Sequence, residues 1–176
     1  PELKKFKGRS LILFNYRGYG QSAGTPGEKE IFEDSLMIYD YVSSREDVRK
    51  EDISTIGRSM GSAVSVYLAE NRPIKKTILV SPPDSIENIA KEVFPYVAIS
   101  LILKHPFDSL SRAPNISTPA LFVIAEKDTL VKPEHSLKLA IAWGGEKDVF
   151  IIEGKNHNDV ADDDYLARGM EFFGEE

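Results

Sequence analysis

The stretch that decides the fold runs from Ile53 to Glu70 and reads ISTIGRSMGSAVSVYLAE. Its first part, ISTIG, is short and rich in β-branched residues, which predicts a buried strand. Its last part is apolar and long enough to predict a buried helix that starts near Met60. Between them, GRSMG at residues 57–61 fits the pattern G-x-S-x-G. A serine at such a strand-to-helix turn is the arrangement of a nucleophile elbow, so the segment predicts Ser59 as a nucleophile.

The tight turn around Ser59 also predicts how negative charge would be stabilised there. Residues 57 and 61 are both glycine, which we expect because side chains two positions before and after the serine would collide. The following helix directs its N-terminus at the turn, and its dipole favours a negative charge. We therefore expect the backbone amide of Met60 to be an oxyanion donor.

Four further apolar segments repeat the strand pattern. They are nearly continuous in aliphatic residues, as is typical of parallel strands covered by helices on both faces. Segments with helical periodicity alternate with them, which predicts an α/β fold with a parallel sheet flanked by helices. The expected strands besides Ile53–Gly57 are Leu11–Tyr16, Thr77–Ser81, Ala120–Ala125 and Val149–Glu153.

The first helix has a readable start and a readable buried face. Thr25, Pro26 and Glu28 fit an N-cap, a proline at the first helical position and a capping-box carboxylate. Ile31 and Val42 mark the two ends of an apolar face at helical spacing. Further helices are expected over 60–70, from 133 to the glycines at 144–145, and over 164–173.

Residues 84–118 interrupt this alternation. They contain helical patterns of their own around 86–93 and 96–103, separated by prolines at 95, 106 and 114. We interpret the segment as a small cap over the carboxyl edge of the sheet, inserted into a partial α/β domain that spans residues 1–176. The alternative is an elaborate crossover that contacts no substrate.

A serine nucleophile needs a base, and the chain has three histidines. His105 lies in the expected cap. His135 lies in the first turn of a helix, where we expect it to be solvated. His157 follows the last strand in the loop EGKNHND, the position this topology uses for its base. We therefore expect His157 to be the base.

The acid that orients the base is expected at the end of a strand. Asp128 follows Ala120–Ala125 almost directly, and the chain order Ser59, Asp128, His157 is the order of such enzymes. Asp84 is the alternative, because it follows the preceding strand, Thr77–Ser81.

Composition limits the classes of function. A chain of 176 residues fits one domain, and its net charge of -6 argues against a nucleic-acid partner. The absence of cysteine excludes disulfides, thiolate zinc sites and a cysteine nucleophile, and it favours a reducing compartment such as the cytoplasm. No apolar run approaches the ~20 residues that span a bilayer, and membrane association is left open. The sequence shows no phosphate loop, dinucleotide fingerprint or metal-ligand cluster, so we expect no cofactor.

Four motifs together resemble a known group, the Bem-type, serine-aminopeptidase-like α/β-hydrolases. They are NYRGYGQSAGTPGE at 15–28, GRSMGSAV at 57–64, EKDTLVKPEHS at 126–136 and NHND at 156–159. The resemblance implies an α/β-hydrolase fold and a triad of Ser59, Asp128 and His157. It also implies hydrolysis of esters or thioesters, from a small-molecule or acyl-protein substrate, through an acyl-enzyme.

The sequence departs from that group in two places. The residues before Asp128 read IAEK, where the group more often has His-Gly. The histidine-glycine loop that supplies the second oxyanion donor is absent, together with the strand before it. That strand would lie between Leu11–Tyr16 and Ile53–Gly57, so we expect these two segments not to pair and an upstream segment to complete the sheet. A catalytically inactive binding scaffold and a peptidase of the same fold remain alternative functions.

Overall fold

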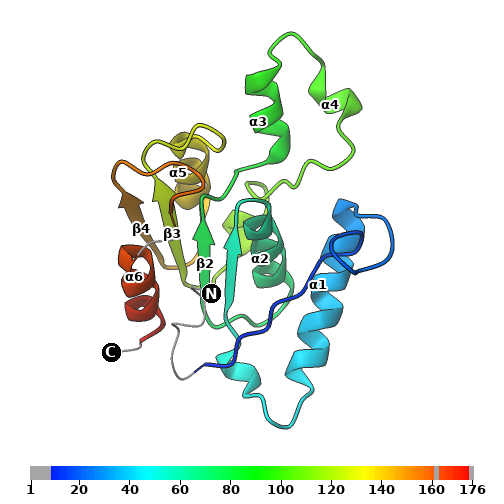
Figure 1. The fold of residues 1–176 in the computed structure, drawn as a ribbon, viewed down its shortest axis with the longest axis vertical. Helices are drawn as coiled ribbons and strands as arrows, with labels where there is room; N and C mark the ends of the chain where they lie inside the picture. Colours follow the sequence, from blue (N-terminus) through cyan, green and yellow to red (C-terminus); the bar gives the residue numbers. More distant parts are fainter. Residues whose placement is uncertain (1–8, 161–162, 175–176) are drawn as a thin grey trace.

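A parallel sheet forms the centre of the molecule (Figure 1). The structure is a computed structural model that describes residues 9–160 and 163–174. Its sheet has the order β1-β2-β3-β4, and all three neighbouring pairs are parallel. The strands are β1 (Thr55–Arg58), β2 (Thr77–Val80), β3 (Ala120–Ala125) and β4 (Lys147–Ile152). The predicted α/β fold is confirmed, and each of these strands begins and ends within two residues of its expected position.

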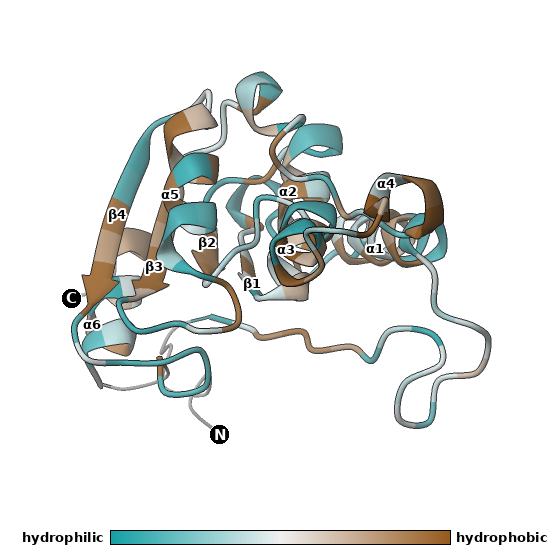
Figure 2. Cartoon of the chain, turned by 90° about the horizontal axis from the view of Figure 1, so that it is seen from above, coloured by the Kyte–Doolittle hydropathy of each residue, from teal (hydrophilic) through white to brown (hydrophobic). Residues whose placement is uncertain are grey.

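Helices cover both faces of the sheet. On one face, Phe122 and Ile124 of β3 pack with Leu139 and Trp143 near α5, together with residues of α2. On the other face, the alternate residues of β3 pack against Leu166 and its neighbours in α6. Figure 2 shows the apolar strands between these layers. The helices are α1 (Glu28–Ser43), α2 (Met60–Asn71), α3 (Ile86–Val93), α4 (Ile99–Ile102), α5 (Pro133–Ala142) and α6 (Asp163–Phe173), with 3-10 turns at Lys50–Asp52 and Ala113–Asn115.

The expectation of a fifth strand at Leu11–Tyr16 is wrong. The segment runs past β1 without joining the sheet (Figure 2), and the exposed fractions of Leu11 and Leu13 are 43% and 73%. As expected, it does not pair with β1, whose described ladder is with β2 alone. The local apolar pattern predicts extended backbone, but a strand also needs a hydrogen-bonded neighbour, which periodicity does not encode.

The expected start of α1 is also wrong. The N-cap is Gly27, and it makes no side-chain cap. The Glu28 carboxylate accepts a hydrogen bond from the amide of Phe107 at 3.1 Å instead of closing a capping box. The expected buried face is present, because Ile31 and Val42 are both buried. A long-range contact therefore replaced the local one at this carboxylate.

The segment with α3 and α4 projects beyond the carboxyl ends of the strands (Figure 1). Ser85 caps α3 by accepting a hydrogen bond from the amide of Asn88 at 2.9 Å. The second helix here is shorter than expected. Tyr96, which precedes it, is 100% exposed, and Leu101 within it is 85% exposed. Among the described residues, no helix is both long and apolar enough to cross a membrane.

Candidate active site

The turn between β1 and α2 holds Ser59 in a strained conformation. Its backbone angles are φ 51° and ψ -124°, in a region that residues with a side chain rarely occupy. Its amide donates to the carbonyl of Val80 at 2.8 Å, and its own carbonyl accepts from the amide of Ser62 at 2.9 Å. These bonds anchor the turn between the sheet and α2, so the fold maintains the strained angle at Ser59.

The two glycines of the turn differ in what they allow. A Cβ at Gly57 would overlap the carbonyl oxygen of Gly61 and the hydroxyl of Ser65, so this position requires glycine. A Cβ at Gly61 would meet only the hydroxyl of Tyr16, at an ordinary 3.6 Å. The expected collision therefore exists at residue 57 and not at residue 61. Burial raises the pKa of Tyr16, so its hydroxyl stays protonated beside the turn.

Asp128 and His157 come together at the carboxyl end of the sheet. His157 Nδ1 lies 2.7 Å from Asp128 Oδ2, and both side chains are almost fully buried. The other carboxylate oxygen, Oδ1, accepts hydrogen bonds from the amides of Leu130 at 2.9 Å and Val131 at 2.8 Å. The carboxylate is thus fixed on one side by backbone, and its other side sets the orientation of the imidazole ring.

The loop that carries His157 is hydrogen-bonded to the residues next to both other candidates, Asp128 and Ser59. Toward Asp128, Oδ1 of Asn156 accepts from the amides of His157 at 2.7 Å and Thr129 at 3.3 Å. Toward Ser59, the guanidinium of Arg58 donates to the carbonyl of His157 at 2.7 Å. Within the described part of the chain, no hydrogen bond links the Ser59 and His157 side chains directly. The sequence analysis did not single out Arg58 or Asn156, although each is adjacent to a candidate residue within a motif: Arg58 in GRSMG and Asn156 in NHND.

Asp84, the alternative acid, belongs to a second aspartate-histidine pair. Its Oδ1 lies 2.8 Å from Nδ1 of His135, and its side chain also accepts from Asn88 at 2.8 Å and Lys138 at 3.2 Å. Burial alone would raise the pKa of Asp84, but hydrogen bonds from Asn88, His135, the Ser85 amide and Lys138 hold it below the usual 3.8. The expectation that His135 is solvated is wrong, because its exposed fraction is 6%. Asp84 therefore contacts His135 and not His157.

His135 links this second pair to α3. Its other ring nitrogen, Nε2, lies 3.3 Å from Oε1 of Glu92 in α3. Glu92 also pairs with Lys132 at 2.8 Å, just before α5. The third histidine, His105, accepts a hydrogen bond from the Glu28 amide at 3.2 Å, on an exposed part of the surface. Of the three histidines, His157 is the one whose backbone is hydrogen-bonded to the residue before Ser59.

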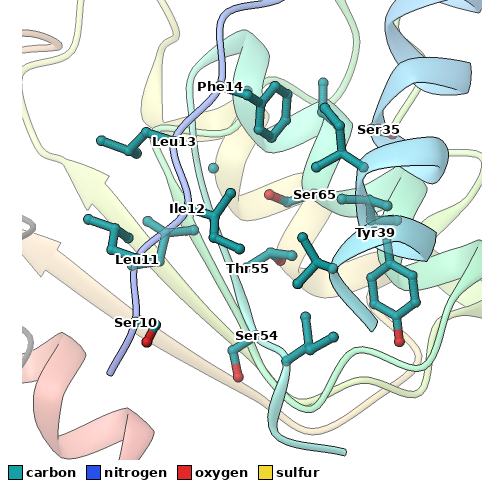
Figure 3. A pocket seen from close by; sticks show the side chains of 18 of the residues that line it. Ser10, Leu11, Ile12, Leu13, Phe14, Ser35, Tyr39, Ser54, Thr55 and Ser65 are labelled. Carbon is teal, nitrogen blue, oxygen red and sulfur yellow. The ribbon is translucent and has the colours of Figure 1, made fainter. Parts of the chain in front are cut away.

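A groove of about 860 Å³ reaches the serine turn from the outer edge of β1. One wall is the segment with Leu11 and Phe14, and the opposite wall includes Thr55 of β1 and Tyr39 of α1 (Figure 3). Ser59, Met60 and Gly61 line it as well. A groove with largely apolar walls therefore borders the candidate nucleophile.

Comparison with known proteins identifies an α/β-hydrolase fold. A family model described as alpha/beta hydrolase fold matches residues 2–99. The chain is similar to an uncharacterized protein of Mycobacterium tuberculosis, 31% identical over 152 residues, 86% of this chain and 54% of that protein. It is also similar to human alpha/beta hydrolase domain-containing protein 17B, 28% identical over 168 residues, 95% of this chain and 57% of that protein. The chain spans about half the length of these curated relatives.

Among solved structures, the chain is similar in fold to an esterase of Pyrococcus furiosus. The TM-score is 0.75 and the sequence identity is 21%, with 98% of this chain and 73% of that chain covered. At this identity the likeness concerns the fold alone.

Proposed function

Because the chain belongs to the α/β-hydrolase-fold family, we propose that it is a serine hydrolase that cleaves carboxylic esters or thioesters. The observation that carries the proposal is the buried contact of 2.7 Å between His157 Nδ1 and Asp128 Oδ2, beside a serine with a φ of 51°. Aspartate, histidine and strained serine at one edge of a parallel sheet are the parts of a catalytic triad. The substrate is a small-molecule or acyl-protein ester or thioester.

The geometry supports a two-step reaction through an acyl-enzyme. His157 Nδ1–H donates a hydrogen bond to the Asp128 carboxylate and keeps its proton, which leaves Nε2 free to take the proton of the Ser59 hydroxyl. Ser59 Oγ then attacks the carbonyl carbon, and the negative oxygen accepts a hydrogen bond from the Met60 amide. Collapse of this intermediate expels the alcohol or thiol, which takes the proton from His157. A water molecule repeats the sequence on the acyl-enzyme and releases the carboxylic acid.

A binding scaffold without turnover is the second candidate. The small number of oxyanion donors favours it, because the Met60 amide is the one donor that can be assigned among the described residues. Loss of a single donor typically costs about 10²–10³ in rate. Peptide hydrolysis would use the same residues, with an amine in place of the alcohol as leaving group.

Active-site labelling separates these candidates. A fluorophosphonate probe reacts only with an activated serine, so the full-length protein should be labelled at Ser59 and the Ser59→Ala variant should not. Ser59→Ala and His157→Ala should each lower nitrophenyl ester turnover by about 10⁴-fold or more while the melting temperature is retained, because triad members act as one unit. Retention of more than about a tenth of the turnover in either variant would exclude the triad.

A further inference from the structure

Arg58 occupies the position immediately before Ser59, at the carboxyl end of β1. Its Nη2 donates to the carbonyl oxygen of His157 at 2.7 Å and lies 3.3 Å from Oδ1 of Asn158. Both acceptors lie in the loop that follows β4, 99 and 100 residues further along the chain. The side chain therefore connects the turn of the expected nucleophile with the loop of the expected base.

Sheet pairing does not set the distance between these two parts. The sheet has the order β1-β2-β3-β4, so the strand before Ser59 and the strand before His157 are separated by two others. At about 4.8 Å per strand, their ends lie on the order of 14 Å apart. The loop after β4 has to reach back across β3 and β2, and no ladder in the described sheet determines where it stops.

Contacts with the residues on either side of Asp128 hold the loop after β4 near that carboxylate. The amide of Lys127 donates to the carbonyl of Lys155 at 2.8 Å, and Asn156 Oδ1 accepts from the amide of Thr129 at 3.3 Å. These bonds set the position of His157 relative to its carboxylate. They do not set it relative to the serine, which lies on a different strand.

We infer that Arg58 is a positioning residue, which holds the loop at His157 against the serine turn so that the imidazole is within reach of Ser59. The inference rests on the proposed hydrolase function and adds a specific role to a residue outside the triad. Arginine suits this role because its guanidinium is always charged and its planar fork can reach two acceptors from one nitrogen. A misplacement of about 1 Å between reacting groups costs on the order of 10²-fold in rate.

A graded series of substitutions at Arg58 in the full-length protein tests the inference. Arg58→Met removes all donors and keeps a similar length, Arg58→Gln keeps a neutral donor, and Arg58→Lys keeps the charge. Arg45→Met is the matched control, because Arg45 is also an exposed arginine whose guanidinium is hydrogen-bonded, here to Asp47, but it lies in the loop after α1. For each protein, active sites are counted by fluorophosphonate titration, and kcat and KM for a nitrophenyl ester are measured per titrated site.

The inference predicts that Arg58→Met lowers kcat per site by about 10- to 100-fold while KM changes by less than about threefold. Arg58→Lys should recover part of the loss, and Arg45→Met should behave as the unaltered protein. If Arg58 only stabilises the fold, Arg58→Met will reduce the number of titrated sites and the melting temperature but leave kcat per site unchanged. That result would overturn the inference and leave the proposed function intact. If the unaltered protein fails to react at Ser59, the proposed function itself is wrong and the role of Arg58 falls with it.

Discussion

Two buried aspartate-histidine pairs lie at the same edge of the sheet. Substitution of the aspartate should have a different consequence in each pair. In both Asp128→Asn and Asp84→Asn the shape of the side chain is retained and one carboxylate oxygen becomes an NH₂ group. What differs is which hydrogen-bond donors face that group. The structure therefore predicts loss of turnover for Asp128→Asn and loss of stability for Asp84→Asn.

At residue 128, the new amide can satisfy the backbone only in one orientation. Its oxygen must accept from the amides of Leu130 and Val131, so its NH₂ group faces Nδ1 of His157. A donor there forces His157 to carry its proton on Nε2, the nitrogen that should receive the proton of Ser59. In serine enzymes this wrong tautomer lowers kcat by about 10⁴-fold. Because the backbone bonds persist, the free energy of unfolding should fall by only about 1–2 kcal/mol.

At residue 84, no orientation of the amide satisfies the surroundings. The carboxylate accepts hydrogen bonds from the Ser85 amide, Asn88 and His135, and it pairs with Lys138. Either orientation places an NH₂ group against at least one of these donors in a fully buried site. Breaking one side of a buried pair costs about 3–5 kcal/mol, which lowers the melting temperature of a domain this size by about 6–20 °C. Turnover per folded site should stay within about threefold, because His135 is not joined to Ser59.

The two effects are measured independently. Thermal unfolding reports stability, and nitrophenyl ester hydrolysis divided by the number of fluorophosphonate-titrated sites reports turnover per site. A larger loss of turnover per site in Asp84→Asn than in Asp128→Asn would refute the assignment of Asp128 as the acid.

Three further predictions follow from particular contacts. Gly57→Ala should lower the free energy of unfolding by about 3 kcal/mol, because the added Cβ would overlap the Gly61 carbonyl. Gly61→Ala should change it by less than about 1 kcal/mol. Equal melting temperatures of the two variants would contradict this prediction. Leu101→Asp should leave the melting temperature unchanged, because Leu101 is 85% exposed. If the cap contacts the acyl group, the same substitution should reduce the preference for long-chain over short-chain nitrophenyl esters. Unchanged relative rates across the ester series would exclude that contact. The depressed pKa of Asp84 means that its stabilising contribution is complete above about pH 5 and is lost as the pH falls below 3.8 through the folded-state value. Urea unfolding between pH 5 and pH 3 should therefore show a steeper loss of stability in the unaltered protein than in Asp84→Asn, and parallel slopes would contradict the assignment.

Local patterns along the chain were enough to predict most of the elements. The run Ala120–Ala125 was expected as a strand and forms β3 with the same bounds, and α3 (Ile86–Val93) matches its periodicity. The strand-to-helix position of Ser59 was also predictable, because glycine spacing and apolar patterning are properties of consecutive residues. Their physical basis is backbone conformation and burial, which neighbours in the sequence largely determine.

Pairing between distant residues was decided by the tertiary structure alone. Four of the five expected strands joined the sheet, whereas Leu11–Tyr16 did not, although its apolar pattern is equally strong. Asp128 meets His157 across 29 residues and Asp84 meets His135 across 51, whereas the sequence favoured Asp128 as the acid but kept Asp84 as the alternative. The contact from Arg58 to the His157 carbonyl spans 99 residues and has no signature in either local segment. Such contacts depend on the order of the strands and the path of the loops, and these follow from the packing of the whole chain and not from the conformational preferences of any one segment.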